Sequence, residues 1–85
     1  MPHSSVAVKI TVAGKLVETK PEKEFLHLFI RFEGETYRVS TRDNGNKRLR
    51  ERGILIGDPV VCFCYEGEVD GKKYILLKEI INNKL

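Results

Sequence analysis

The sequence has no tryptophan, one methionine and only two cysteines among its 85 residues. Two cysteines cannot build the disulfide framework typical of small secreted domains, and alone they leave a zinc site short of its four ligands. No apolar run approaches the roughly 20 residues that a membrane-spanning helix needs, which excludes a helical membrane protein. Residues 1–5 lack the basic and apolar segments of a secretory signal. We therefore expect an intracellular protein, in the cytoplasm, nucleoid or nucleus, with no membrane association.

Motifs for catalysis are missing as well. The chain has no phosphate-cradling glycine loop, no nucleophile elbow and no metalloprotease motif. His3 and His27 are not at a spacing typical of metal ligands, and no serine, cysteine or carboxylate pairing near His27 suggests catalysis. We predict a protein that is not an enzyme, has no catalytic residues and requires neither a metal nor a cofactor.

A length of 85 residues suffices for one small domain. We assign residues 1–85 to it, with a flexible N-terminus at 1–5 and a C-terminal tail at 81–85. Its formal net charge is +3, from 15 basic and 12 acidic residues. Because this excess is small, the position of the cations says more about function than their number.

The most informative stretch is Phe25–Arg42, which predicts two antiparallel strands joined by a turn at Glu33-Gly34. A two-residue turn fixes which residues face each other across the hairpin. One face of the hairpin is almost wholly apolar and should point to a core. Its predicted pairs are Phe32 with Glu35, Ile30 with Tyr37, Leu28 with Val39, and Leu26 with Thr41.

The opposite face combines aromatic and basic side chains, where a soluble sheet normally presents mixed charges to water. Phenylalanine rings stack on bases and arginines hold phosphates, so this composition indicates single-stranded nucleic acid. The alternative is that loops or a partner subunit cover the rings. The predicted pairs on this face are Arg31 with Thr36, Phe29 with Arg38, His27 with Ser40, and Phe25 with Arg42.

Before this hairpin, alternating residues predict a strand over Val6–Gly14 that continues through Lys15–Glu18. Gly14 indicates a bend at which one long strand serves two sheets of a barrel, although it could also simply weaken an ordinary strand. A charged loop with Pro21 at its centre is expected over Thr19–Glu24.

After the hairpin, Asn46 is a suitable N-cap for a short helix over Lys47–Arg52, and Gly53 is a suitable residue to end it. Residues Ile54–Ile56 should dock this helix on the core. The remaining predicted elements are strands over Val60–Tyr65 and Lys72–Ile80, with a hairpin turn at Asp70-Gly71 between them.

This order of elements resembles the OB-fold, a small Greek-key barrel. The resemblance rests on three stretches, Ile10–Val17, Ile56–Val61 and Gly71–Ile80. The helix between strands three and four argues against an SH3-like barrel. We therefore predict an all-β, five-stranded Greek-key OB-fold barrel with one short helix between strands 3 and 4. The resemblance implies that single-stranded nucleic acid binds across strands two and three and the loops that flank them.

Strand alternation and the resemblance thus indicate the same surface. We predict low-specificity binding of single-stranded nucleic acid, DNA in preference to RNA. The flanking loops carry acidic residues beside their lysines, which weakens them as phosphate clamps. A run of cations extends the face toward the predicted helix, where the alternative is an ordinary solvated helix surface. The predicted binding residues are Phe25, His27, Phe29, Arg31, Arg38, Arg42, Lys47 and Arg48.

The fourth predicted strand supports an alternative function. Cys62 and Cys64 share one face at the limit of the Cα separation that a disulfide tolerates, and we expect them to be core thiols. Val61, Phe63 and Tyr65 would then face outward as a second apolar strip. The C-terminal tail could cap this strip, the nucleic-acid face could continue into it, or an oligomer could bury it. The strip is the candidate protein interface of the alternative function, an OB-fold subunit that contacts protein or forms an oligomer.

Overall fold

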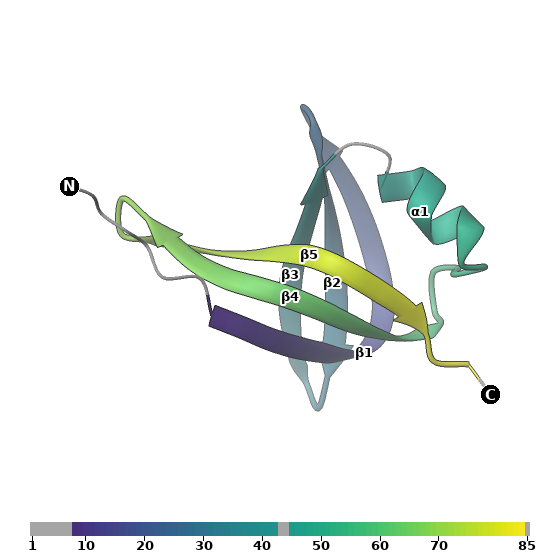
Figure 1. Cartoon of the computed structure of the whole chain (residues 1–85). Coiled ribbons are helices and arrows are strands. Elements are labelled where there is room, and N and C mark those ends of the chain that lie inside the picture. The colour runs from purple at the N-terminus through teal and green to yellow at the C-terminus, as the bar shows by residue number, and fades with distance from the viewer. Residues whose placement is uncertain (1–7, 43–44, 85) are drawn as a thin grey trace.

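The computed structural model describes residues 8–42 and 45–84, in which five strands close into a barrel (Figure 1). The strand order around the barrel is β1-β2-β3-β5-β4. The predicted all-β, five-stranded barrel with a short helix between strands three and four is confirmed. The elements are β1 (Val8–Glu22), β2 (Phe25–Phe32), β3 (Glu35–Arg42), α1 (Gly45–Glu51), β4 (Pro59–Val69) and β5 (Lys72–Asn82).

Strand β1 changes partner at its bend, as the glycine predicted. Lys15 is paired with Pro59 of β4 and also with Arg31 of β2. A Cβ atom on Gly14 would lie 2.4 Å from the carbonyl oxygen of Arg31. Only a residue without a side chain lets the two backbones approach this closely. The glycine therefore allows one strand to belong to both halves of the barrel.

Strands β2 and β3 pair in the predicted register, from Phe25 opposite Arg42 to Phe32 opposite Glu35. Glu33 and Gly34 have φ angles of 50° and 82°, as a two-residue type I′ turn requires. The turn thus sets every facing pair of the hairpin.

The core forms between the inner faces of the strands. On β2, the side chains of Leu28 and Ile30 are 0% exposed. The prediction that the whole inner face of the hairpin is buried is wrong at its tip, where Phe32 is 50% and Tyr37 is 37% exposed. Phe32 lies beyond Arg31, at which the pairing of β2 with β1 ends, and it lines a surface hollow together with Tyr37.

Strand β1 is longer than predicted. It continues to Glu22, so the expected loop over Thr19–Glu24 is reduced to the turn at Lys23 and Glu24. Pro21 is accommodated near the end of the strand, opposite Leu26. A proline lacks a donor for the ladder but is tolerated at such marginal strand positions.

The helix also differs from the prediction at its start, because it begins at Gly45 and Asn46 lies inside it. It ends at Glu51, one residue before the predicted end. Gly53 terminates it as predicted, with a φ angle of 66° and an N–H that donates to the carbonyl of Arg50 over 3.0 Å. The N–H of Ile54 donates to the carbonyl of Leu49 over 2.9 Å. These two bonds form a Schellman motif.

Of the three apolar residues expected to dock the helix, only Ile54 is buried; Leu55 and Ile56 are 68% and 56% exposed. The cause is a tight turn that directs both side chains outward. In this turn the N–H of Asp58 donates to the carbonyl of Leu55, and the N–H of Leu55 donates to the Asp58 carboxylate. The hydrogen bond from Leu55 and, to a smaller extent, the contact with Lys84 lower the pKa of Asp58.

The C-terminal tail, expected from residue 81, continues β5 as far as Asn82. The Asn82 side chain donates to the carbonyls of Arg52 and Gly53 over 3.2 and 3.1 Å. Lys84 lies 3.1 Å from the carboxylate of Asp58. Asn82 and Lys84 thus tie the C-terminal end of β5 to the segment after the helix. The predicted flexible segment at residues 1–5 lies outside the described residues.

Cys62 and Cys64 are buried free thiols, as predicted. Removal from water raises the pKa of Cys62 to about 12 and that of Cys64 to about 11. Neither thiol is therefore ionised near neutral pH. Within the described ranges, no helix is long and apolar enough to cross a membrane. No group of three or more histidine, cysteine or acidic residues there could hold a metal ion.

Candidate nucleic-acid interface

A groove of about 790 Å³ lies on the outer face of the barrel, between the β2–β3 hairpin and β5. It contains four of the predicted binding residues, Phe25, His27, Arg38 and Arg42. Two acidic residues, Glu22 and Glu24, also line it. The cations that line the groove come from three parts of the chain and are Lys23, Arg38, Arg42, Lys72 and Lys73.

Phe25 is an aromatic residue of the groove with a cation and a second ring beside it. The Cζ atom of Arg42 lies 5.4 Å from the centroid of the Phe25 ring, which is cation–π distance. The His27 ring lies parallel to it, with centroids 6.3 Å apart and planes 7° from parallel. Because β2 and β3 hold these three residues on one face, a flat apolar surface and a positive charge are presented together.

His27 is fixed by two contacts that bridge three strands. Its Nδ1 lies 2.7 Å from the hydroxyl of Ser40 on β3, and its Nε2 lies 2.9 Å from the carboxylate of Glu22 on β1. In the neutral imidazole, the hydroxyl donates to Nδ1 and Nε2–H donates to the carboxylate. The predicted position of Ser40 opposite His27 is confirmed, whereas the contact with Glu22 was not predicted, because Glu22 was assigned to a loop. Ser40 is 6% exposed, so the contacts orient the imidazole and leave the hydroxyl little access to a substrate.

The other predicted residues of the hairpin continue the same face toward its turn. Phe29 is half-buried and lies opposite Arg38. Arg31 is exposed and has Thr36 on one side and Lys15 on the other. Neither Phe29 nor Arg31 lines the groove. They form an open extension of it along β2.

The β5 wall of the groove was not predicted. Tyr74 and Leu76 are 38% and 44% exposed and face the hairpin across the groove. Leu76 is paired with Ser40 where β5 meets β3. Tyr74 lies opposite Gly67, where an added Cβ would touch nothing within 4 Å. Strand alternation could have grouped these two residues, but the parallel contact between β3 and β5 joins segments too far apart for a sequence pattern to reveal.

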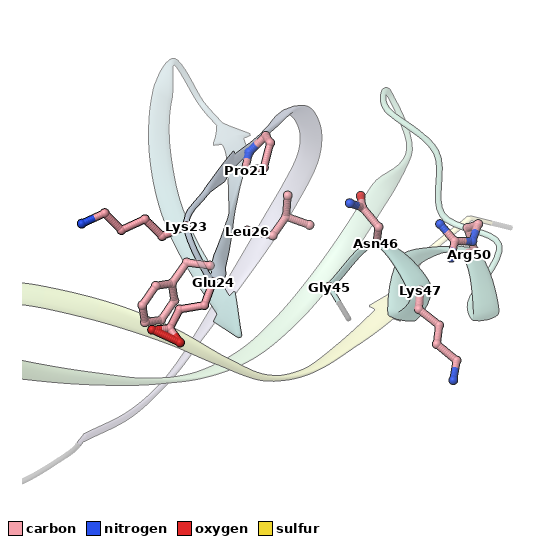
Figure 2. Close-up of a pocket in the computed structure, with 9 residues that line it drawn as sticks. Pro21, Lys23, Glu24, Leu26, Gly45, Asn46, Lys47 and Arg50 are labelled. Carbon is pink, nitrogen blue, oxygen red and sulfur yellow. The ribbon is translucent and has the colours of Figure 1, made fainter. Parts of the chain in front are cut away.

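Lys47 and Arg48 lie away from this groove. Lys47 lines a separate cleft of about 350 Å³ between the β1–β2 turn and α1 (Figure 2). Lys23 and Lys47 extend from opposite sides of this cleft, and Phe25 lines both hollows. Arg48 instead donates to the carbonyl of Lys78 on β5 over 3.3 Å.

The outward strip on β4 has the predicted orientation. Phe63 is 40% exposed, whereas Val61 and Tyr65 are half-buried. Ile81 of β5 lies opposite Val61 and is 44% exposed, so it widens the strip. Leu76 pairs with Ser40 on one side and with Tyr65 on the other. The outer face of the hairpin therefore continues around β5 into the strip.

Comparisons with known proteins agree with this architecture. No protein-family model matches the sequence, and no curated protein matches it. Two crystal structures of Rim1, a mitochondrial single-stranded DNA binding protein from S. cerevisiae, superpose with TM-scores of 0.69 and 0.68. The chain has an OB-fold. Each alignment covers 93% of this chain and 96% or 97% of the Rim1 chain, at 16% sequence identity. At this identity the likeness establishes the fold.

Proposed function

We propose that the protein binds single-stranded nucleic acid, DNA in preference to RNA, across the outer face of β2 and β3. The observation that carries this proposal is the open groove in which Phe25 lies beside Arg42 and His27. Similarity to a single-stranded DNA binding protein supports the choice of DNA. The protein would act by binding alone, as an intracellular, non-enzymatic factor.

The groove chemistry explains how a strand would be held with little sequence specificity. Bases stack on Phe25 and Phe29, and each stacked base contributes about 1–3 kcal/mol regardless of its identity. Arg31, Arg38 and Arg42 pair with phosphates. These contacts use ring faces and backbone charge, so they do not distinguish base edges. Lys47 offers a further phosphate contact where the strand passes the cleft beside α1.

A fluorescence anisotropy titration with a labelled oligonucleotide tests the proposal. With three to five phosphate contacts, the slope of log K against log salt should be about −2 to −3.5. Single-stranded DNA, duplex DNA and single-stranded RNA of one sequence should be titrated in parallel, and the DNA single strand should bind most tightly. Absence of binding at low salt would refute the proposal.

A second candidate function is self-association through the apolar end of the β4 strip. Phe63 and Ile81 are 40% and 44% exposed, and Val61 lies between Ala13 and Ile81. Clustered apolar side chains of this kind mark contact surfaces. We propose a second copy of the chain as the occupant. Sedimentation equilibrium at micromolar concentration should then show a dimer that Phe63→Glu dissociates, and a strictly monomeric wild type would exclude it.

A further inference from the structure

The strip on β4 is not uniform, because Tyr65 at one end has basic neighbours. Tyr65 lies opposite Lys9 of β1 and Leu76 of β5. The Nζ atom of Lys78 lies 5.6 Å from the centroid of the Tyr65 ring. An aromatic ring with lysines on both sides repeats the combination that Phe25 and Arg42 form in the groove.

Phe63, two residues earlier on the same strand and face, has different neighbours. It lies opposite Thr11 of β1 and Glu79 of β5. The carboxylate of Glu79 is paired with the guanidinium of Arg52. The charges beside Phe63 thus form an acid–base pair, whereas lysines lie on both sides of Tyr65. Only the Tyr65 end of the strip therefore suits a polyanion.

Leu76 connects the Tyr65 end of the strip to the groove. It lines the groove, is 44% exposed, and is paired with both Ser40 and Tyr65. Adjacent strands lie about 4.8 Å apart, so β3 and β4 are separated by roughly 10 Å across β5. Nucleotides that rise about 3.4 Å each would cover this distance in about three steps. A strand that leaves the groove over Leu76 thus arrives at Tyr65.

We infer that a second segment of the same nucleic-acid strand binds across β5 onto β4, where a base stacks on Tyr65 and phosphates pair with Lys9 and Lys78. This inference rests on the proposed function of the groove. The surface fits a phosphate chain better than a protein, because lysine is depleted in protein–protein interfaces. Contacts at Tyr65 would thus lengthen the stretch of nucleic acid that the protein binds, and they need no additional pocket.

Oligonucleotides of two lengths separate this segment from the groove. OB-folds occupy about 4–16 nucleotides, so oligothymidylates of about 6 and about 16 residues provide a short and a long probe. Tyr65→Leu should bind the short probe within about twofold of the wild type and the long probe about fivefold or more weakly, since one stacked base is lost. Lys9→Gln/Lys78→Gln should reduce the salt slope for the long probe by about 1.4.

Phe63→Leu is the matched control, because it removes a ring from the same strand and face but keeps the position apolar, and it should leave both probes unaffected. Thermal unfolding checks that each variant remains folded. Unchanged affinity and salt slope for the long probe, with short-probe binding intact, would overturn this inference alone. Equal weakening of both probes would also overturn it, since Tyr65 would then have no separate segment. A wild type that binds neither probe would overturn the proposed function first.

Discussion

The two faces of β2 carry large apolar side chains in different surroundings. Leu28 and Ile30 on the inner face are fully buried, whereas Phe25 and Phe29 on the outer face remain half-buried beside Arg42 and Arg38. Phe32 is also exposed, at 50%, but it has the acidic residue Glu35 opposite it, so we do not expect a base to stack on it. An accessible ring becomes a candidate base-stacking site when its neighbours are cations.

The largest expected effect is on the inner face. Leu28→Ala removes a side chain that is 0% exposed and leaves a cavity in the barrel. We expect the free energy of unfolding to fall by about 2–5 kcal/mol. Urea denaturation followed by circular dichroism measures this loss. A change below about 1 kcal/mol would mean that the barrel interior can close around the gap.

On the outer face, Phe25→Ala should weaken binding of single-stranded DNA by about 1–3 kcal/mol, because one stacking platform is removed. The free energy of unfolding should change less than for Leu28→Ala, because Phe25 is only half-buried. Anisotropy titration measures the affinity and urea denaturation measures the stability. A variant that loses stability but keeps its affinity would reverse the roles assigned to the two faces.

Arg38→Gln tests the charge that accompanies the rings. Arg38 is exposed, lines the groove and lies opposite Phe29. Loss of one phosphate contact should reduce the salt slope for a single strand by about 0.7. Arg52→Gln is a suitable control, because Arg52 is paired with Glu79 outside the groove. An equal change in slope for both variants would indicate a general charge effect.

The inner face of β4 gives the most specific effect. Burial raises the pKa of Cys62 to about 12 and that of Cys64 to about 11, from an ordinary value of 9.0. Because the folded protein keeps these protons longer, the stabilisation is complete below the unfolded pKa and is lost as the pH rises toward the folded pKa. Urea midpoints should therefore fall from about pH 8 to about pH 10 more in the wild type than in Cys62→Ala/Cys64→Ala. Identical pH dependence would contradict this.

Much of the outer face of the hairpin could be predicted from the sequence, because one turn determines its register. Glu33-Gly34 sets the register of the hairpin, and the register places Phe25, Phe29 and the arginines on one side. The alternation on β4 similarly placed the two cysteines inward. Both inferences concern residues that are close in the sequence. Strand alternation decides which face each residue lies on, and a short turn decides which residues are opposite each other.

The unpredicted features depend on contacts between distant segments or on a local exception. The pairing of Ser40 with Leu76 closes the barrel and creates the groove, yet nothing in the sequence around either residue indicates that they pair. The continuation of β1 through Pro21 brings Glu22 to His27, although proline usually ends a strand. Tertiary structure therefore supplied the β5 wall and the orientation of His27.

The central claim is that the outer face of β2 binds single-stranded DNA, and two phenylalanines on this strand test it most directly. Phe29 and Phe32 both lie on β2 but on opposite faces. In parallel anisotropy titrations at low salt, Phe29→Ala should weaken binding by about 1–3 kcal/mol, and Phe32→Ala should bind like the wild type. Equal affinities for both variants, or a loss confined to Phe32→Ala, would contradict the claim.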